Sequence, residues 1–211
     1  MIRDEQKNNL SKSIIKVYVD GCCEPVNPGG IAAYGFVVYK NGEKIYEECG
    51  IVGVGALGDD VSNNVAEYVA LIKALEYLLR AGLTDRRITV MSDSQLIVRQ
   101  IRGEYSVRAP RLIMLHRKAT ELLNKFIECR VEWIPREMNE EADSLSKKAY
   151  LQFVRENESL VRKYYGRYFA SRSELELLRM YGISIDYPIS KVEARKLLKR
   201  ILKKRYGVDN T

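Results

Sequence analysis

Four acidic residues stand where an ordinary soluble fold would place apolar or neutral side chains: Asp20, Glu67, Asp93 and Asp143. A carboxylate on a buried face is costly unless a counter-charge neutralises it. A cluster of carboxylate oxygens without histidine or cysteine is the ligand set that Mg²⁺ or Mn²⁺ prefers. The pattern therefore predicts metal-dependent chemistry, with these four residues as metal ligands and catalytic groups.

Other metal centres are disfavoured by the remaining ligand types. The four cysteines include no Cys-x-x-Cys pair, and the single histidine, His116, lies in a stretch with helical spacing. Neither matches the spacing of a zinc site. Taken singly, Asp93 or Asp143 is better explained as a helix cap, so the hypothesis depends on the four acids converging.

Two of the acids follow predicted strands. The β-branched and aromatic run at residues 14–19 predicts a strand that ends at Asp20. The short apolar run at 87–91 predicts a second strand, which leads to Asp93.

The other two acids begin helices. Residues 64–80 have helical spacing, with Glu67 on the same side as the apolar stripe that includes Leu71 and Leu75. Asn139 is a suitable N-cap for a helix over residues 140–153, whose first turn contains Asp143. Strand ends and helix starts of this kind can meet at one edge of a sheet.

The remaining elements complete an α/β domain. Asn41-Gly42 between two β-prone runs predicts a hairpin. The expected elements are strands at 32–39, 43–51 and 128–133 and helices at 95–101 and 110–125. This order predicts a five-stranded mixed sheet flanked by helices.

Three segments are expected: an N-terminal tail at 1–13, a catalytic domain at 14–153 and a small helical C-terminal extension at 157–211. The extension has two Ser-x-x-Glu capping boxes, and its expected helices are 159–169, 174–181 and 191–206.

The net charge of +7 lies entirely in the last part of the chain. Residues 151–211 have 14 basic and seven acidic residues, whereas residues 1–150 have equal numbers of each. Such a segment suits either a polyanionic partner or a merely solvated helical face. The basic residues expected to face phosphates are Lys196, Lys199, Arg200, Lys203 and Lys204.

The sequence has no apolar run long enough for a membrane span and no secretory leader, so we expect a cytoplasmic protein without membrane association. No obligatory protein partner is indicated. Because little precedes the first predicted strand, a free-standing enzyme is expected.

Four short motifs carry a resemblance to a known family. They are Tyr18-Val19-Asp20-Gly21, Asn63-Asn64-Val65-Ala66-Glu67, Ser92-Asp93-Ser94-Gln95 and Asn139-Glu140-Glu141-Ala142-Asp143. In order and spacing they resemble the acidic motifs of type 1 ribonuclease H, over about residues 14–150. Each motif alone is weak, but the ordered quartet is specific.

The resemblance implies an endoribonuclease that cuts the RNA strand of RNA–DNA hybrids and leaves 5′-phosphate and 3′-hydroxyl ends. Two Mg²⁺ or Mn²⁺ ions would serve each active site. Asp20 would bridge both ions, Glu67 and Asp93 would complete one site, and Asp143 would complete the other.

The resemblance also implies substrate contacts. Asn64 and Gln95 match positions that contact RNA 2′-hydroxyls and bases in the minor groove, where RNA is distinguished from DNA. Ser62 matches a hydroxyl that holds a DNA-strand phosphate. Asn27 lies in the corresponding first loop, although that loop differs in length.

Two features depart from the family pattern. Many members have a histidine in the loop before the last motif, and here Arg136 is the nearest cation that could replace it. Residues 101–111 lead directly into the next helix, so the basic handle of bacterial enzymes is missing. Both losses resemble archaeal and some Bacillus-type members, and double-stranded RNA stays open as a second substrate.

Three alternatives differ in testable sequence features. A noncatalytic hybrid- or RNA-binding module on the same scaffold predicts a broken carboxylate, and none is broken. Transposases, integrases and 3′–5′ exonucleases use other acidic spacings. A domain cut from a reverse transcriptase would not be expected to begin at Met1.

Overall fold

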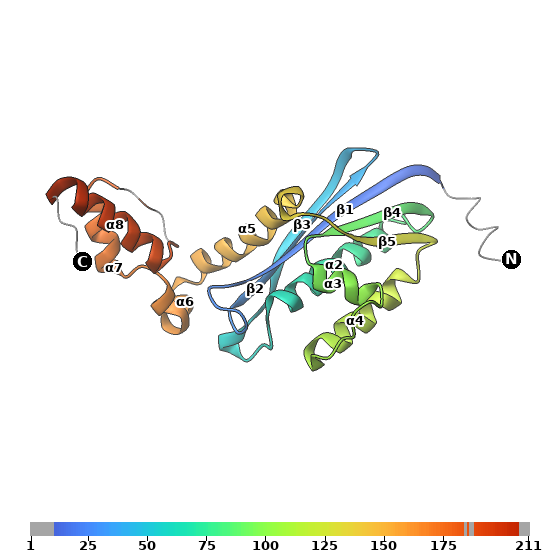
Figure 1. The fold of residues 1–211 in the computed structure, drawn as a ribbon, viewed down its shortest axis with the longest axis horizontal. Helices are drawn as coiled ribbons and strands as arrows, with labels where there is room; N and C mark the ends of the chain where they lie inside the picture. The colour runs from blue at the N-terminus through green and yellow to red at the C-terminus, as the bar shows by residue number, and fades with distance from the viewer. Residues whose placement is uncertain (1–10, 184, 186–187, 207–211) are drawn as a thin grey trace. The chain divides into compact units, whose positions relative to one another are not determined.

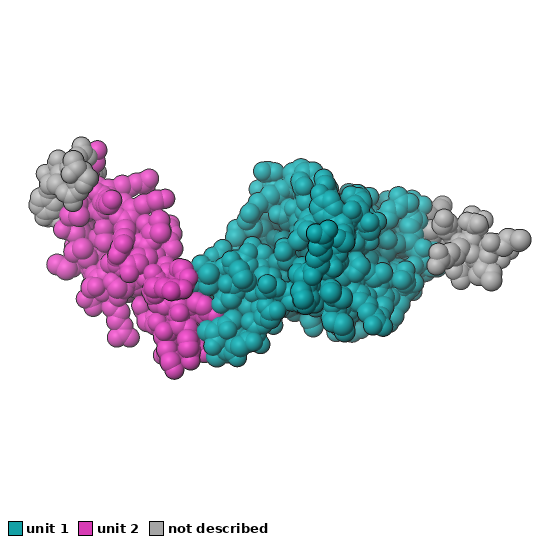
Figure 2. Space-filling model, turned by 60° about the horizontal axis from the view of Figure 1, so that its bottom comes forward, with its two compact units in different colours: residues 1–150 teal, residues 151–211 magenta. Residues whose placement is uncertain are grey.

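The computed structural model describes residues 11–183, 185 and 188–206. The chain divides into two compact units, residues 1–150 and residues 151–211, which Figure 2 colours separately. No helix in the described ranges is both long and apolar enough to cross a membrane.

The first unit contains one five-stranded mixed sheet, as the sequence predicts (Figure 1). Its strands are β1 (Ser11–Glu24), β2 (Ile31–Lys40), β3 (Glu43–Val54), β4 (Arg86–Ser92) and β5 (Glu128–Trp133). The order across the sheet is β3-β2-β1-β4-β5. The first three strands pair antiparallel, and β4 pairs parallel with both β1 and β5.

The first strand is longer than predicted at both ends. Ser11 already pairs with Arg86, so the expected tail at 1–13 is shorter, and residues 1–10 lie outside the described part of the chain. The prediction that the strand ends at Asp20 was wrong, because the antiparallel ladder with β2 continues to Glu24. The parallel ladder with β4, by contrast, stops at Tyr18. Asp20 therefore lies just beyond the point where β1 separates from β4.

Helices complete this unit. They are α2 (Asn63–Arg80), α3 (Gln95–Ile101), α4 (Pro110–Leu123) and α5 (Glu140–Glu156), with short 3-10 turns η1 (Gly55–Leu57) and η2 (Arg136–Met138). Alternate residues of β1, including Val17 and Val19, join Leu71 and Leu75 of α2 in the main apolar core. Asp20 projects from the other face of β1.

Two glycines allow the helices that carry acidic residues to approach the sheet closely. A Cβ on Gly21 would lie 2.3 Å from the Glu67 backbone nitrogen, and one on Gly35 would lie 2.5 Å from the Ser146 nitrogen. Gly21 thus admits α2 against β1, and Gly35 admits α5 against β2. Because Asp20 pairs with Gly35, this contact brings α5 beside Asp20.

The second unit is helical, as predicted. It contains α6 (Glu158–Tyr165), η3 (Gly166–Tyr168), α7 (Arg172–Met180) and α8 (Lys191–Tyr206). The Ser171–Glu174 capping box is complete, and Ser190 Oγ accepts the Glu193 amide at 3.1 Å. A small apolar cluster joins α7 to α8.

Helix α8 does not bury all of its apolar residues. Val192 is 65% exposed. Ala194 and Leu198, one helical turn apart, are the buried residues of α8 instead. Val192 precedes Ala194 by two residues and therefore points away from that stripe.

Candidate metal centre and substrate-binding residues

Three of the four predicted carboxylates converge. Asp20 of β1, Glu67 of α2 and Asp93, which follows β4, each offer an oxygen, and these atoms lie within 4.8 Å of one another. Asp20 is buried, whereas Glu67 and Asp93 are partly exposed.

Each of the three carboxylates accepts a hydrogen bond from an uncharged side chain. The pairs are Ser146 Oγ to Asp20 Oδ2 at 2.5 Å, Ser92 Oγ to Glu67 Oε2 at 3.3 Å, and Asn139 Nδ2 to Asp93 Oδ1 at 2.9 Å. Uncharged donors orient a carboxylate without neutralising it, so the cluster keeps its negative charge.

The electrostatics of the cluster favour a cation. Burial, opposed by the Ser146 hydrogen bond and reinforced by the Asp93 and Asp143 carboxylates, raises the pKa of Asp20 to about 6. Burial and then the charges of Asp20 and Asp93 raise the pKa of Glu67 well above its ordinary value. Within the described residues, no basic side chain forms an ion pair with Asp20, Glu67 or Asp93. An all-oxygen set of this kind fits Mg²⁺ or Mn²⁺.

Asp143 is set apart from this group. Arg136 Nη2 lies 3.0 Å from its Oδ1, and Lys147 Nζ lies 2.5 Å from its Oδ2. The Arg136 side chain is 69% exposed. The structure therefore brings Arg136 to the predicted acidic site, but as a counter-ion of Asp143.

Ser62, which is expected to hold a DNA-strand phosphate, and Asn27, which is expected to contact substrate from the first loop, both contact the start of α2. Ser62 is buried, and its Oγ accepts the Val65 amide at 3.3 Å as the N-cap of the helix. Asn27 Oδ1 accepts the Asn63 amide at 3.0 Å, which ties the first loop to the same helix end.

The two residues expected to read the RNA strand lie beside the acidic residues in the chain. Asn64 is partly exposed in the first turn of α2, three residues before Glu67. Gln95 is exposed as the first residue of α3, two residues after Asp93.

Sequence reasoning missed two contacts of Asp93. The side chain of Asn139 was expected to cap α5, but it binds the Asp93 carboxylate. Trp133 Nε1 donates to the Asp93 carbonyl oxygen at 3.1 Å, although the ring remains 44% exposed. The presence of Asn139 in the fourth motif and of a lone tryptophan at a strand end were the available signals.

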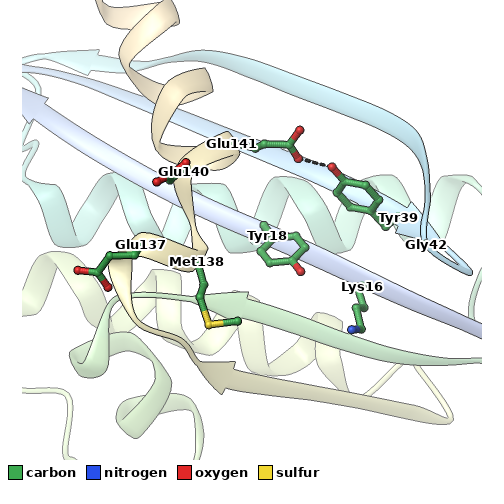
Figure 3. A pocket seen from close by; sticks show the side chains of 8 residues that line it. All are labelled: Lys16, Tyr18, Tyr39, Gly42, Glu137, Met138, Glu140 and Glu141. Carbon is green, nitrogen blue, oxygen red and sulfur yellow. Dashed lines mark hydrogen bonds between the residues drawn. The ribbon is translucent and has the colours of Figure 1, made fainter.

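A pocket of roughly 410 Å³ lies beside the site and was not predicted (Figure 3). Tyr18, two residues before Asp20, and Met138, which precedes Asn139, contribute to its wall. Across the pocket, the Tyr39 hydroxyl donates to the Glu141 carboxylate.

The basic residues of the second unit are where helical spacing predicts. Lys196, Lys199, Arg200 and Lys203 are exposed on α8. The side chain of Lys204 lies outside the described residues.

The chain was compared with protein families of known sequence. A family model described as reverse transcriptase-like matches residues 19–149, which is more than half of the chain. The match includes all four predicted carboxylates.

Relatives of known sequence include a ribonuclease HI. Ribonuclease HI of Halobacterium salinarum is 37% identical over 138 residues, which are 64% of this chain and 63% of that protein. The bifunctional protein Rv2228c of Mycobacterium tuberculosis is 35% identical over 123 residues, which are 58% of this chain and 32% of that protein. The chain thus spans about a third of the mycobacterial protein and less than two thirds of the halobacterial one.

Solved structures agree with these relatives. The crystal structure of RNase H1 from H. salinarum has a TM-score of 0.57 at 32% identity and covers 65% of this chain and 97% of its own. LC11-RNase H1, solved in complex with an RNA/DNA hybrid, has a TM-score of 0.58 at 37% identity, with 64% and 95% covered. The chain belongs to the reverse transcriptase-like family and, within it, to the type 1 ribonucleases H. The predicted ribonuclease H-like fold is thereby confirmed.

Proposed function

We propose that this protein is a metal-dependent endoribonuclease that cleaves the RNA strand of RNA–DNA hybrids. The observation that carries the proposal is the Asp20–Glu67–Asp93 cluster, whose oxygens lie within 4.8 Å without a basic partner among the described residues. A relative of 37% identity was solved with an RNA/DNA hybrid, which supports this substrate.

The proposed mechanism divides the acidic residues between two ions. Two Mg²⁺ or Mn²⁺ ions, when bound, would supply an activated water and stabilise the leaving 3′ oxygen. Asp20, Glu67 and Asp93 would hold one ion, and Asp20 with Asp143 would hold the other. Cleavage in this sense yields 5′-phosphate and 3′-hydroxyl ends.

Arg136 is proposed to act at the leaving phosphate. Its guanidinium is exposed and contacts only one oxygen of Asp143, at 3.0 Å. A phosphate oxygen offers a guanidinium the same kind of charge-assisted bond as this carboxylate. Arg136 is therefore available to exchange Asp143 for a phosphate when substrate binds.

Substrate selection is assigned to the helix starts beside the cluster. Asn64 and Gln95 are proposed to contact 2′-hydroxyls in the minor groove. Ser62 and Asn27 already bind backbone amides at the start of α2. Ser62 retains hydrogen-bonding capacity for a DNA-strand phosphate, and Asn27 retains it for a substrate contact, since a hydroxyl and an amide both make several hydrogen bonds.

Residues 157–211 are proposed to supply a basic surface for the substrate, because residues 1–150 carry no net charge. Lys196, Lys199 and Arg200 are exposed on one helix, and their charges suit phosphates rather than one base sequence. Lys203 and Lys204 extend the same basic segment.

One assay tests the activity. Each strand of an RNA–DNA hybrid, an RNA duplex and a DNA duplex is end-labelled in turn and incubated with the protein in Mg²⁺ or Mn²⁺. We expect internal cleavage of the hybrid's RNA strand only, with 5′-phosphate products. Cleavage of the RNA duplex would add the second substrate, and binding without cleavage of any strand would favour the noncatalytic module.

A further inference from the structure

Asn139 occupies the position of a helix cap without acting as one. Its carbonyl oxygen accepts the Asp143 amide at 3.0 Å, which marks it as the residue before the first turn of α5. An asparagine there normally stabilises the helix by accepting an amide of the first turn with its side-chain oxygen. Here Nδ2 instead donates to the Val19 carbonyl oxygen at 3.0 Å and to Asp93 Oδ1 at 2.9 Å.

This arrangement costs the fold stability. The residue is 1% exposed, and its Oδ1 is buried without a hydrogen-bond partner in the described part of the chain. A buried acceptor without a donor destabilises a protein, and the side-chain cap is lost as well. Stabilisation of α5 therefore does not explain why an asparagine stands here.

The positions of the two acceptors, the Val19 carbonyl oxygen and Asp93 Oδ1, explain why residue 139 is an asparagine. Val19 immediately precedes Asp20 on β1, and Asp93 follows the end of β4. The parallel ladder between these strands stops at Tyr18 and Met91. The side-chain amide of Asn139 thus links β1 to the residues that follow β4, beyond the last backbone pair of the two strands. This is where Asp20 and Asp93 contribute their carboxylates to the cluster.

We propose that Asn139 is a positioning residue for the metal centre, which fixes the Asp93 carboxylate relative to the backbone beside Asp20. This inference rests on the proposed function, because it assigns the cluster to metal binding. Holding Oδ1 of Asp93 leaves its second oxygen for the ion. Residues that orient a metal ligand in this way change affinity 10–100-fold when mutated.

The test uses Asn139→Thr in the full chain. Threonine is close to asparagine in volume and can cap α5, but its one hydroxyl donor cannot serve both acceptors. Mn²⁺ binding is measured by the electron paramagnetic resonance signal of the free ion, without substrate. We expect Mn²⁺ affinity to fall at least about tenfold. The Mn²⁺ concentration for half-maximal cleavage should rise in parallel, while the KM for hybrid at saturating Mn²⁺ stays within about twofold.

A matched control separates positioning from general loosening. Tyr34→Phe removes a partly buried hydrogen bond to Glu48, 2.7 Å long, between β2 and β3, which involves none of the clustered carboxylates. It should leave Mn²⁺ affinity unchanged. If Asn139→Thr does not fold, Asn139→Ser, which caps equally well and is smaller, takes its place.

Two outcomes would overturn the inference. One is parental Mn²⁺ affinity in the folded Asn139 variant, and the other is an equal loss of affinity in Tyr34→Phe. Failure of the proposed function would look different. The parent protein would then bind Mn²⁺ more tightly than the Asn139 variant, yet neither would cleave a hybrid.

Discussion

At the scale of single residues, the three clustered carboxylates differ from Asp143 in the partners that surround their negative charge. Asp143 has an arginine and a lysine within 3.0 Å. The other three have serine or asparagine donors, which orient them but leave their charge in place. A divalent ion should therefore bind more favourably at the cluster than at Asp143 alone.

Removing one cluster charge should abolish activity without unfolding the protein. We expect Asp20→Asn, Glu67→Gln and Asp93→Asn each to lower turnover roughly a hundredfold or more, because metal ions contribute several kcal/mol to such reactions. Hybrid affinity should survive. The melting temperature without metal should hold or rise, since a repulsive charge is lost. Near-parental turnover in two of the variants would exclude the cluster as the catalytic site, and a large fall in melting temperature would indicate structural acids.

The raised pKa of Asp20 predicts a pH dependence of stability without metal. The pKa is about 6 in the fold against an ordinary 3.8, so the folded state holds the proton more firmly than the unfolded state. Stability is therefore present at low pH and lost as pH rises from about 4 through 6, by about 3 kcal/mol at most. Denaturant unfolding of the parent and Asp20→Asn across this range should give a difference that grows with pH. A constant difference would contradict the raised pKa.

Arg136 should act on turnover more than on binding. Its guanidinium lies at Asp143 and is exposed to an incoming phosphate. We expect Arg136→Ala to lower kcat roughly tenfold or more and to change hybrid affinity little, as for a group that acts mainly in the transition state. Single-turnover kinetics with a separate binding titration would measure both. Equal losses in kcat and in hybrid affinity would assign Arg136 to substrate binding. No loss in either would make it a surface arginine without a role in the reaction.

The sequence located the acidic residues because their order and spacing are visible along the chain. It did not reveal how Asn139 is used. Local pattern gives a side chain before a helix the role of a cap, whereas here two acceptors from β1 and from beyond β4 decide its direction. Those acceptors are more than 40 residues away, so only tertiary structure identifies them.

At the scale of elements, strand ladders and close helix–strand contacts set the position of the cluster. The extension of β1 to Glu24 was missed, since Gly21 and the adjacent cysteines give only a weak strand signal. Pairing with β2 determines that extension. The elements with strong periodicity, such as α2 and β5, matched their predicted bounds to within a residue.

The glycine contacts should be intolerant of a methyl group. An alanine Cβ at Gly35 would lie 2.5 Å from the Ser146 nitrogen and 2.8 Å from the Ala142 oxygen, so α5 would have to move. We expect Gly35→Ala to cost about 1–3 kcal/mol of unfolding free energy, as overpacking does. It should also weaken Mn²⁺ binding, because Ser146 shifts from Asp20. Denaturant unfolding and Mn²⁺ titration would test both effects.

Gly166→Ala is the matched control. Nothing lies within 4 Å of a Cβ there, and its φ of −53° suits alanine. It should be neutral or slightly stabilising. A Gly35→Ala protein that matches this control in both stability and Mn²⁺ affinity would show that the α5 contact can relax without affecting the site.

At the scale of the whole molecule, charge and chemistry are divided between the two units. The clustered carboxylates belong to residues 1–150, which carry no net charge, and the whole excess of +7 belongs to residues 151–211. The sequence predicted this division from composition. It did not predict what the extension does, because a basic helix serves a polyanion or solvation equally well.

The salt dependence of the KM for hybrid distinguishes a phosphate-binding extension from one whose basic helix is only solvated. Replacing Lys196, Lys199 and Arg200 together by alanine removes three exposed charges from α8 without touching its buried residues Ala194 and Leu198. If these residues bind phosphates, the KM for hybrid should rise, and its dependence on the logarithm of salt concentration should flatten by about 0.9 for each lost contact. The kcat should persist, because the acidic residues are unchanged. Deleting residues 157–211 should have a larger effect in the same direction. An unchanged slope in a folded triple variant, with a lowered melting temperature in the deletion, would instead assign the extension to structural support.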